Sequence, residues 1–327
     1  SLAKELQENF TNARLSKIAQ PEKDELLLTM KGSNGQKRLL LSASASLPLV
    51  YISDKNKPSP MTAPNFCMLP RKHIGSARIL SVTQPGLERI LIFELEHLNE
   101  LGDICRKKLI VEIMGKHSNI IFCNDQGKII DSIKHVSAQM SSVREVLPGR
   151  EYFIPDTMQK VDPLTVTSEE FAVHLTGKPM PLAKAIYTSF TGISPVTAEE
   201  ICSLAGMDSS VPAQEYSADI LLHLYTQFEI YLSAIKEDTF SPGIYFDGKE
   251  PKEFSALPLS HFVNYTRVEY DSVSEVLETY YSTRSLITRI RQKSVDLRHV
   301  VQTALERNRK KYDLQLRQLK DTENREK

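Results

Sequence analysis

The final stretch of the chain, residues 272–327, contains neither glycine nor proline. Both residues interrupt helices, and roughly 55 residues without them far exceed the length of an ordinary globular helix. Ser272 and Glu275 have capping-box spacing, so a long helix is predicted to begin there. Apolar side chains then recur at seven-residue intervals: Leu305, Tyr312 and Leu319. This repeat favours the first arm of a coiled coil. The polar run 308–311 interrupts the seam, so the helix could instead lay a basic face on another surface.

The first 157 residues consist of short apolar runs that turn-forming residues separate. A helix is predicted at residues 2–10. Strands are predicted at residues 15–18, 26–30, 37–42, 49–52, 78–83, 89–95, 109–113, 120–123 and 128–132. The Asn34-Gly35 step between two of them is a strong hairpin signal. Short strands with frequent turns favour a mostly antiparallel β sandwich or barrel over repeated β-α-β units.

One predicted hairpin, at residues 109–122, has polar residues at its tip. Its flanks are rich in Ile and Val, which favour buried strands, and between them stand Gly115, Lys116, His117 and Ser118. A cation and an imidazole held by two strands could grip a phosphate or a base. Spacing alone favours the simpler alternative, a surface hairpin with a solvated lysine.

A second basic cluster, Arg71, Lys72 and His73, lies in a short predicted helix at residues 70–74. Pro70 suits the first turn of a helix, where no amide hydrogen is needed. The cluster could contact phosphate. Cations near a helix end also stabilise the helix itself, so both interpretations stay open.

Helical periodicity replaces the strand pattern beyond residues 148–155. Within it, residues 192–201 predict a tight turn and a helix that Thr197 and Glu200 would cap and Gly206 would end. Further on, a core helix is predicted at 221–235. β-like segments follow at residues 241–246 and 253–259.

Two helices joined by a short glycine turn have the form of a helix-hairpin-helix element. In such an element Gly192 and Ser194 could contact a backbone phosphate. Ser194 stands where a second glycine is usual, and Glu199 and Glu200 would repel phosphate. These departures favour a purely structural role. His261 is expected to pack or cap, because no partner stands at a metal-binding spacing.

Charge is unevenly distributed although the net charge is zero. Residues 1–157 carry 21 basic and 17 acidic side chains, residues 158–283 carry 7 and 18, and residues 284–327 carry 13 and 6. Clustered Lys and Arg supply most phosphate contacts, so the two ends are expected to meet a polyanion. Charged helices can vary this much without any ligand.

The composition, 41% apolar and 25% charged, is typical of a globular protein. No apolar run approaches the roughly 18 residues of a membrane span, and the first ten residues lack a signal-peptide core, which predicts a cytoplasmic protein. The cysteines stand far apart: Cys67, Cys105, Cys123 and Cys202. Neither a disulfide framework nor a zinc site is predicted, and no cofactor is expected.

Five motifs occur in order along the chain: Met68–His73, Gly86–Ile90, Glu112–Asn119, Ile130–His135 and Leu147–Gly149. In order and spacing they resemble the NFACT family, also described as the fibronectin/fibrinogen-binding protein A family. The resemblance covers nearly the whole chain and implies an α+β fold. Residues 1–157 would form a β-rich domain similar to the amino-terminal domain of formamidopyrimidine-DNA glycosylases. A helix-hairpin-helix domain (158–271) and the first arm of a truncated coiled coil (272–327) would follow.

The resemblance implies a non-catalytic factor of ribosome-associated quality control. Such proteins bind large ribosomal subunits obstructed by peptidyl-tRNA and recruit alanyl-tRNA. They support template-free addition of alanine to the stalled nascent chain.

The resemblance also implies tRNA-contact residues. In the family an acidic residue beside an arginine helps to read the anticodon region, and Glu88-Arg89 is the matching pair, with Glu in place of the usual Asp. A second tRNA-contact motif matches Glu112-Ile113-Met114, and Lys116 and His117 would lie beside it.

Two other functions remain open. The family name motivates a fibronectin-binding adhesin at the cell surface, although this sequence shows neither signal peptide nor anchor. Fold analogy alone motivates a nucleic-acid repair enzyme. Glycosylase chemistry is not expected, because this sequence does not start with the native amino terminus that those enzymes use as nucleophile.

Overall fold

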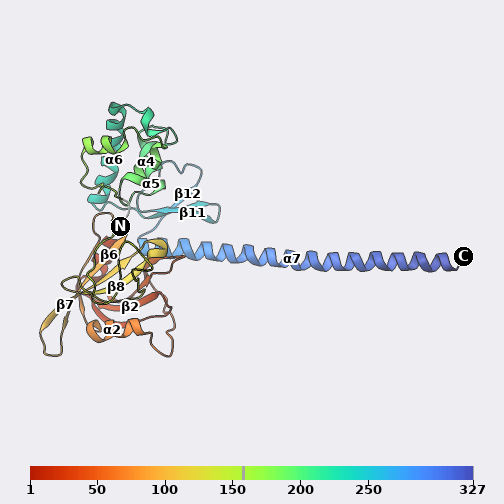
Figure 1. Cartoon of the computed structure of the whole chain (residues 1–327), viewed down its shortest axis with the longest axis horizontal. Coiled ribbons are helices and arrows are strands. Elements are labelled where there is room, and N and C mark those ends of the chain that lie inside the picture. The colour runs from red at the N-terminus through yellow and green to blue at the C-terminus, as the bar shows by residue number, and fades with distance from the viewer. Residues whose placement is uncertain (157–158, 327) are drawn as a thin grey trace.

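The computed structural model describes residues 1–156 and 159–326 and shows three parts (Figure 1). A β-rich part lies beside a mainly helical part, and one long helix extends away from both. This arrangement is α+β, as predicted. The predicted boundary between residues 157 and 158 lies outside the described residues. Within those residues, no helix has the length and apolar character needed to cross a membrane.

The β-rich part is a nine-stranded antiparallel sheet with the strand order β4-β3-β2-β1-β5-β6-β7-β8-β9. Its elements are α1 (Leu2–Phe10), β1 (Arg14–Ala19), β2 (Glu25–Gly32), β3 (Gly35–Ser42), β4 (Leu49–Ser53), α2 (Asn65–Ile74), β5 (Arg78–Thr83), β6 (Ile90–Leu98), β7 (Ile104–Glu112), β8 (Asn119–Asn124) and β9 (Ile129–Ser132). The predicted antiparallel, strand-rich character of these residues is therefore confirmed, whereas the sandwich or barrel stays a prediction.

The sheet has two halves that share one hydrophobic core. Only one residue pair, Arg14 with Arg78, joins β1 to β5. Side chains from both halves enter the same buried cluster, among them Leu28 of β2 and Phe122 of β8, and Phe10 of α1 packs with them. This cluster uses one face of each strand. The opposite face of β1, β2 and β3 carries a small buried cluster of Ala19, Leu27 and Leu40 toward one end, and polar and charged residues toward the other.

The predicted start of the basic helix at Pro70 is wrong. Helix α2 begins at Asn65 and contains Pro70 in its interior. Phe66 and Cys67 are buried in the first turn, and the Cys67 amide donates to the side-chain oxygen of Gln20 at 3.2 Å. Tertiary contacts thus stabilise a first turn that local sequence does not reveal.

The second part has its own core. It contains α3 (Ser168–Leu175), α4 (Leu182–Ser189), α5 (Pro195–Leu204), α6 (Ala218–Lys236), β10 (Gly243–Asp247), β11 (Glu250–Ser255) and β12 (Thr266–Glu269). Phe171 packs against Phe228 with ring centroids 4.8 Å apart, and against Phe190 at 5.3 Å. The short sheet has the order β11-β10-β12. β11 ends earlier than predicted, and no prediction included β12.

Helix α7 (Val273–Arg325) begins where predicted. The Ser272 hydroxyl accepts the Glu275 amide at 3.1 Å. The carboxylate of Glu5, on α1, accepts the amides of Val273 at 2.9 Å and Ser274 at 3.2 Å, which attaches the helix to the β-rich part. The seam residues Leu305, Tyr312 and Leu319 are 67%, 62% and 58% exposed. The coiled coil stays a prediction.

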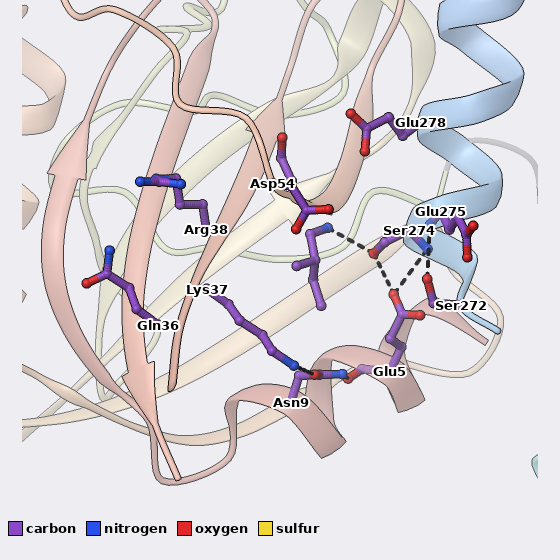
Figure 2. Close-up of a pocket in the computed structure, with 12 residues that line it drawn as sticks. Glu5, Asn9, Gln36, Lys37, Arg38, Asp54, Ser272, Ser274, Glu275 and Glu278 are labelled. Carbon is purple, nitrogen blue, oxygen red and sulfur yellow. Dashed lines mark hydrogen bonds between the residues drawn. The ribbon is translucent and has the colours of Figure 1, made fainter. Parts of the chain in front are cut away.

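A polar cavity of about 440 Å³ lies at this attachment (Figure 2). Its walls come from α1, β3, β4 and the start of α7, and they mix acidic with basic side chains. None of the residues predicted to contact RNA lines it.

Candidate nucleic-acid interface

Three segments that are distant in sequence meet beside the junction of the two folded parts. The loop 84–89 precedes β6, and the turn 113–118 follows β7. The Ile113 amide donates to the Arg89 carbonyl oxygen at 2.8 Å, and Ile90 pairs with Glu112. The turn 190–194 between α4 and α5 packs on the same loop, because a Cβ added to Gly192 would lie 2.4 Å from the Leu87 carbonyl oxygen.

Glu88 and Arg89 differ in exposure. Glu88 is half-buried, and this burial raises its pKa above 4.5. The negative charge of Asp156 raises the pKa further, while the positive charge of Arg89 lowers it. Arg89 is exposed, and none of the ion pairs among the described residues involves it. Its guanidinium can therefore fork onto a base edge or phosphate from solution.

Glu112 was predicted to contact tRNA, but its side chain has no exposed surface in this structure, so the contact stays a prediction without structural support. One carboxylate oxygen accepts a hydrogen bond from Arg144, and the other accepts the Tyr152 hydroxyl at 2.9 Å. Arg144 also donates to the Phe153 carbonyl oxygen at 2.7 Å. The group holds the segment 144–153 over the end of β7, and the observed role of Glu112 is to position this segment.

The turn after Glu112 exposes only part of its predicted motif. Ile113 packs against the main core, and Met114 packs against a smaller cluster on the other face of the sheet. The Ser118 hydroxyl accepts the Met114 amide at 2.8 Å and closes the turn. Lys116 and His117 are exposed on this turn, whose first residue, Ile113, bonds to the loop 84–89, and both remain candidate contacts.

The cluster Arg71, Lys72 and His73 lies elsewhere. Burial lowers the pKa of His73 below 6.5. Lys107 and Lys72 lower this pKa further, and Glu100 raises it. The centroid of the His73 ring lies 6.1 Å from that of the Phe122 ring. Phe122 pairs with Leu109, which pairs with Phe93 in the middle of β6, four residues or about 13 Å along the strand from Arg89. The basic cluster is therefore separated from the Glu88-Arg89 pair by about half the length of β6.

Arg71 of that cluster already uses one of its hydrogen-bond donors within the protein. The Nε atom of Arg71 donates to the Ile18 carbonyl oxygen at 2.7 Å, although the side chain is exposed. His73, with its lowered pKa, is mainly neutral at pH 7 and offers little attraction to phosphate. Lys72 is the cation of the three that is best suited to bind an anion.

The prediction that Thr197 and Glu200 cap α5 is wrong. Ser194 caps the helix, since its hydroxyl accepts the Thr197 amide at 3.1 Å. Gly192 adopts a positive φ of 77° and packs on Leu87. Ser194 and Gly192 thus have structural roles here. A phosphate contact at this turn stays a prediction.

Glu200 is buried and links α5 to the loop before β12. It accepts the Ser260 amide at 2.8 Å and His261 Nδ1 at 2.6 Å. Burial alone would raise its pKa, but hydrogen bonds from His261 and Ser260 outweigh burial and hold it below 4.5. It therefore does not face solvent, where it would repel phosphate.

This lowered pKa predicts an acid-sensitive contribution to stability. The contribution is complete above pH 4.5, the ordinary value, and is lost as pH falls through the lower folded pKa. At pH 6 the wild-type protein should have a higher free energy of unfolding than the Glu200→Gln variant, and this difference should shrink below pH 4.5. Urea unfolding of both proteins at several pH values measures this difference. A difference that does not depend on pH would show that the Glu200 carboxylate does not make the acid-sensitive contribution.

Arg144, Tyr152, Asp156 and Lys160 were not predicted as parts of this region. Arg144 stands in a polar stretch without periodicity, and its partner Glu112 is 32 residues away. Asp156 and Lys160 affect the pKa of Glu88 only because the chain returns beside the loop 84–89. No local sequence signal identifies such pairs.

Comparison with known proteins identifies relatives along the whole chain. The family described as "NFACT N-terminal and middle domains" matches residues 1–327. The chain is 36% identical over 309 residues to the Rqc2 homolog RqcH of Bacillus subtilis (strain 168), covering 94% of this chain and 52% of that protein. It is 31% identical over 320 residues to the Rqc2 homolog RqcH of Streptococcus suis, covering 98% and 53%. The chain thus spans about half the length of these curated relatives.

Solved structures of similar fold come from bacterial binding proteins. The N-terminal part of the fibronectin/fibrinogen-binding protein from Streptococcus suis has a TM-score of 0.68 and 30% identity, covering 86% of this chain and 96% of that one. The fibrinogen binding protein from Staphylococcus aureus has a TM-score of 0.72 and 26% identity, with the same coverage. The sequence match along all 327 residues and the shared fold show that this chain belongs to the NFACT family.

Proposed function

We propose that this chain is the tRNA-binding and ribosome-binding part of a ribosome-associated quality control factor. The relatives named RqcH support the quality control role. The carrying observation is the bond between the Ile113 amide and the Arg89 carbonyl, which places exposed Arg89 beside the turn that bears Lys116 and His117. These cationic and hydrogen-bonding groups suit single-stranded bases and backbone phosphates of a tRNA loop.

In the complete factor, the proposed partners are a large ribosomal subunit obstructed by peptidyl-tRNA, and alanyl-tRNA. The proposed outcome is template-free alanine tailing of the stalled nascent chain. This chain would contribute binding and orientation, with peptide transfer left to the ribosome, so we assign it no catalytic residue. Glu88 would accept from a base amino group while Arg89 binds a base or phosphate.

Replacing Glu88 and Arg89 together with alanine is expected to weaken tRNA binding roughly tenfold or more, since each good bidentate contact contributes about 1–3 kcal/mol. Titration of labelled tRNA with the purified chain measures the loss. Lys184→Ala, an exposed cation on α4, is the matched control. Equal affinity of the double variant and the control would refute this surface as the tRNA site.

A second candidate function is fibronectin or fibrinogen binding at the cell surface. It is favoured only by the names of the structurally similar proteins. Immobilised fibronectin that retains the purified chain in a saturable manner, together with surface labelling on intact cells, would support it. Absence of both would leave the RNA-binding function alone.

A further inference from the structure

The face of the large sheet that lies opposite its core carries a row of basic side chains. Directly paired residues of an antiparallel sheet project from the same face. The register aligns one residue from each of six neighbouring strands: Gln36, Lys31, Arg14, Arg78, Glu96 and Arg106. We call Lys31, Arg14, Arg78 and Arg106 the basic row.

The row faces solvent. Its sequence neighbours Leu15, Met30 and Ile79 are buried in the main core, so the row residues point the other way. Lys31, Arg14 and Arg106 are exposed, and Arg78 is half-buried. Figure 2 shows the same alternation in β3, where Gln36 and Arg38 project to the side opposite Lys37.

A second, shorter line of charge lies next to the row. The register aligns Arg38, Thr29 and Lys17 across β3, β2 and β1. Lys17 is exposed and Arg38 half-buried. Six cations therefore share this face across neighbouring strands.

The arrangement is electrostatically unfavourable in the free protein. The bonds from the Leu15 amide to the Ala77 carbonyl and from the Ile79 amide to the Ala13 carbonyl, both 2.9 Å, flank Arg14 and Arg78. The two arginines are thus a non-hydrogen-bonded pair, in which cross-strand side chains approach most closely and like charges destabilise.

One carboxylate compensates part of this charge. Glu96 pairs with Arg78 at 2.8 Å. In the part of the chain that the structure describes, no ion pair includes Arg14, Lys31 or Arg106. An anion bound along the row would relieve the repulsion.

We propose that the basic row is a second RNA-contact surface, which binds the sugar-phosphate backbone without reading base sequence. Four strand spacings separate Lys31 from Arg106, about 19 Å, which is long enough for several phosphates of one strand. The exposed Gln36 amide at the end of the row can also donate to phosphate oxygens. A row of cations across neighbouring strands, with no aromatic residue in it, suits a linear polyanion better than a protein surface. The proposal takes RNA as ligand from the proposed function but concerns a different site.

The row is distinct from the Glu88-Arg89 surface. Glu96 lies seven residues along the chain from Arg89, and β6 runs between them, a span of about 23 Å. The RNA could be the body of the same tRNA or a ribosomal RNA segment, since both offer the same phosphates.

The test compares two triple variants of this chain. The row variant is Arg14→Gln, Lys31→Gln and Arg106→Gln. The control is Lys23→Gln, Lys184→Gln and Lys249→Gln, three exposed cations outside the row. Binding to a short RNA hairpin of arbitrary sequence, to tRNA and to purified large ribosomal subunits is measured over a series of salt concentrations.

The row variant should bind the hairpin roughly 10- to 100-fold more weakly at low salt, and its slope of log affinity against log salt should fall by about 2 to 3. Loss of tRNA binding would identify tRNA as the source of the phosphates, and loss of subunit binding alone would identify ribosomal RNA. Row and control variants with equal affinities and slopes would overturn the proposal, and so would a wild-type chain that binds no RNA.

The Glu88→Ala, Arg89→Ala variant separates this outcome from failure of the proposed function. If that variant binds tRNA as wild type does, while the row variant loses the hairpin, the tRNA site is refuted and the row is supported. Near-UV circular dichroism of both triple variants verifies the fold, and removing cross-strand repulsion should not lower the Tm.

Discussion

Replacing Arg144 with methionine is expected to lower the free energy of unfolding by about 3–5 kcal/mol at neutral pH. Arg144 is the cation that compensates Glu112, whose side chain is fully buried, and the Arg144 side chain is itself only 10% exposed. Without the guanidinium, a buried carboxylate would keep only the Tyr152 hydroxyl as partner. Urea unfolding monitored by circular dichroism measures the change.

A nearby exposed ion pair provides the control. Arg150 Nε lies 2.7 Å from Glu145, but the Arg150 side chain is 62% exposed. Arg150→Met should therefore cost at most about 1 kcal/mol. The double variant Glu112→Met, Arg144→Met should recover much of the stability that Arg144→Met loses, because it leaves no unpaired charge. If Arg144→Met costs no more than Arg150→Met, the buried pair does not secure the segment 144–153.

The Arg144→Met variant also tests whether the buried group of Glu112, Arg144 and Tyr152 supports the proposed RNA surface. Glu112 ends β7 directly before Ile113, whose amide binds the Arg89 carbonyl. Loosening Glu112 should therefore weaken tRNA binding although Arg144 contacts no RNA in the proposal. Measured below the unfolding transition, reduced tRNA affinity with an unchanged circular dichroism spectrum is the expected result.

Replacing Gly192 with alanine is the second change with a large expected effect. Gly192 has a φ of 77°, and an added Cβ would lie 2.4 Å from the Leu87 carbonyl oxygen and 2.5 Å from the Leu87 Cβ. The left-handed conformation costs roughly 1–2 kcal/mol for a residue with a side chain. Overpacking against backbone adds roughly 1–3 kcal/mol. The loop 84–89 must also move, so tRNA binding should weaken.

Gly177 separates these two effects. Its φ is 75°, but nothing lies within 4 Å of an added Cβ. Gly177→Ala should therefore show only the conformational cost, with unchanged tRNA affinity. Chemical unfolding of both variants gives the difference. Equal losses of stability for Gly192→Ala and Gly177→Ala would show that the contact with Leu87 is relieved without cost.

Local patterns predicted several elements of the structure correctly. Residues 107–112 and 119–124 pair as a hairpin where one was predicted, with Leu109 opposite Phe122. Gly35 has a positive φ of 94° at the predicted Asn-Gly turn. Ser272 caps α7. Each feature depends on residues a few positions apart, so the information needed is present in a short segment.

Errors arose where distant partners decide the outcome. Glu112 is a charged residue at the end of a strand, where solvent exposure is expected, yet Arg144 and Tyr152 bury it. Glu200 has capping spacing from Thr197, but it turns inward to His261, 61 residues away. The Arg71 cluster and the Glu88-Arg89 pair belong to motifs of the same resemblance, yet the cluster packs near the middle of β6 and the pair precedes its start.

By itself, the sequence determined the strand-rich amino-terminal half, the long carboxy-terminal helix and the NFACT resemblance, because periodicity, turn chemistry and caps act over a few residues. The tertiary structure alone decided which candidate side chains reach solvent together. It placed Arg89 beside the turn that bears Lys116 and His117, buried Glu112, and aligned Lys31, Arg14, Arg78 and Arg106 across strands. Strand register and long-range ion pairs control that placement, and both depend on contacts between segments tens of residues apart.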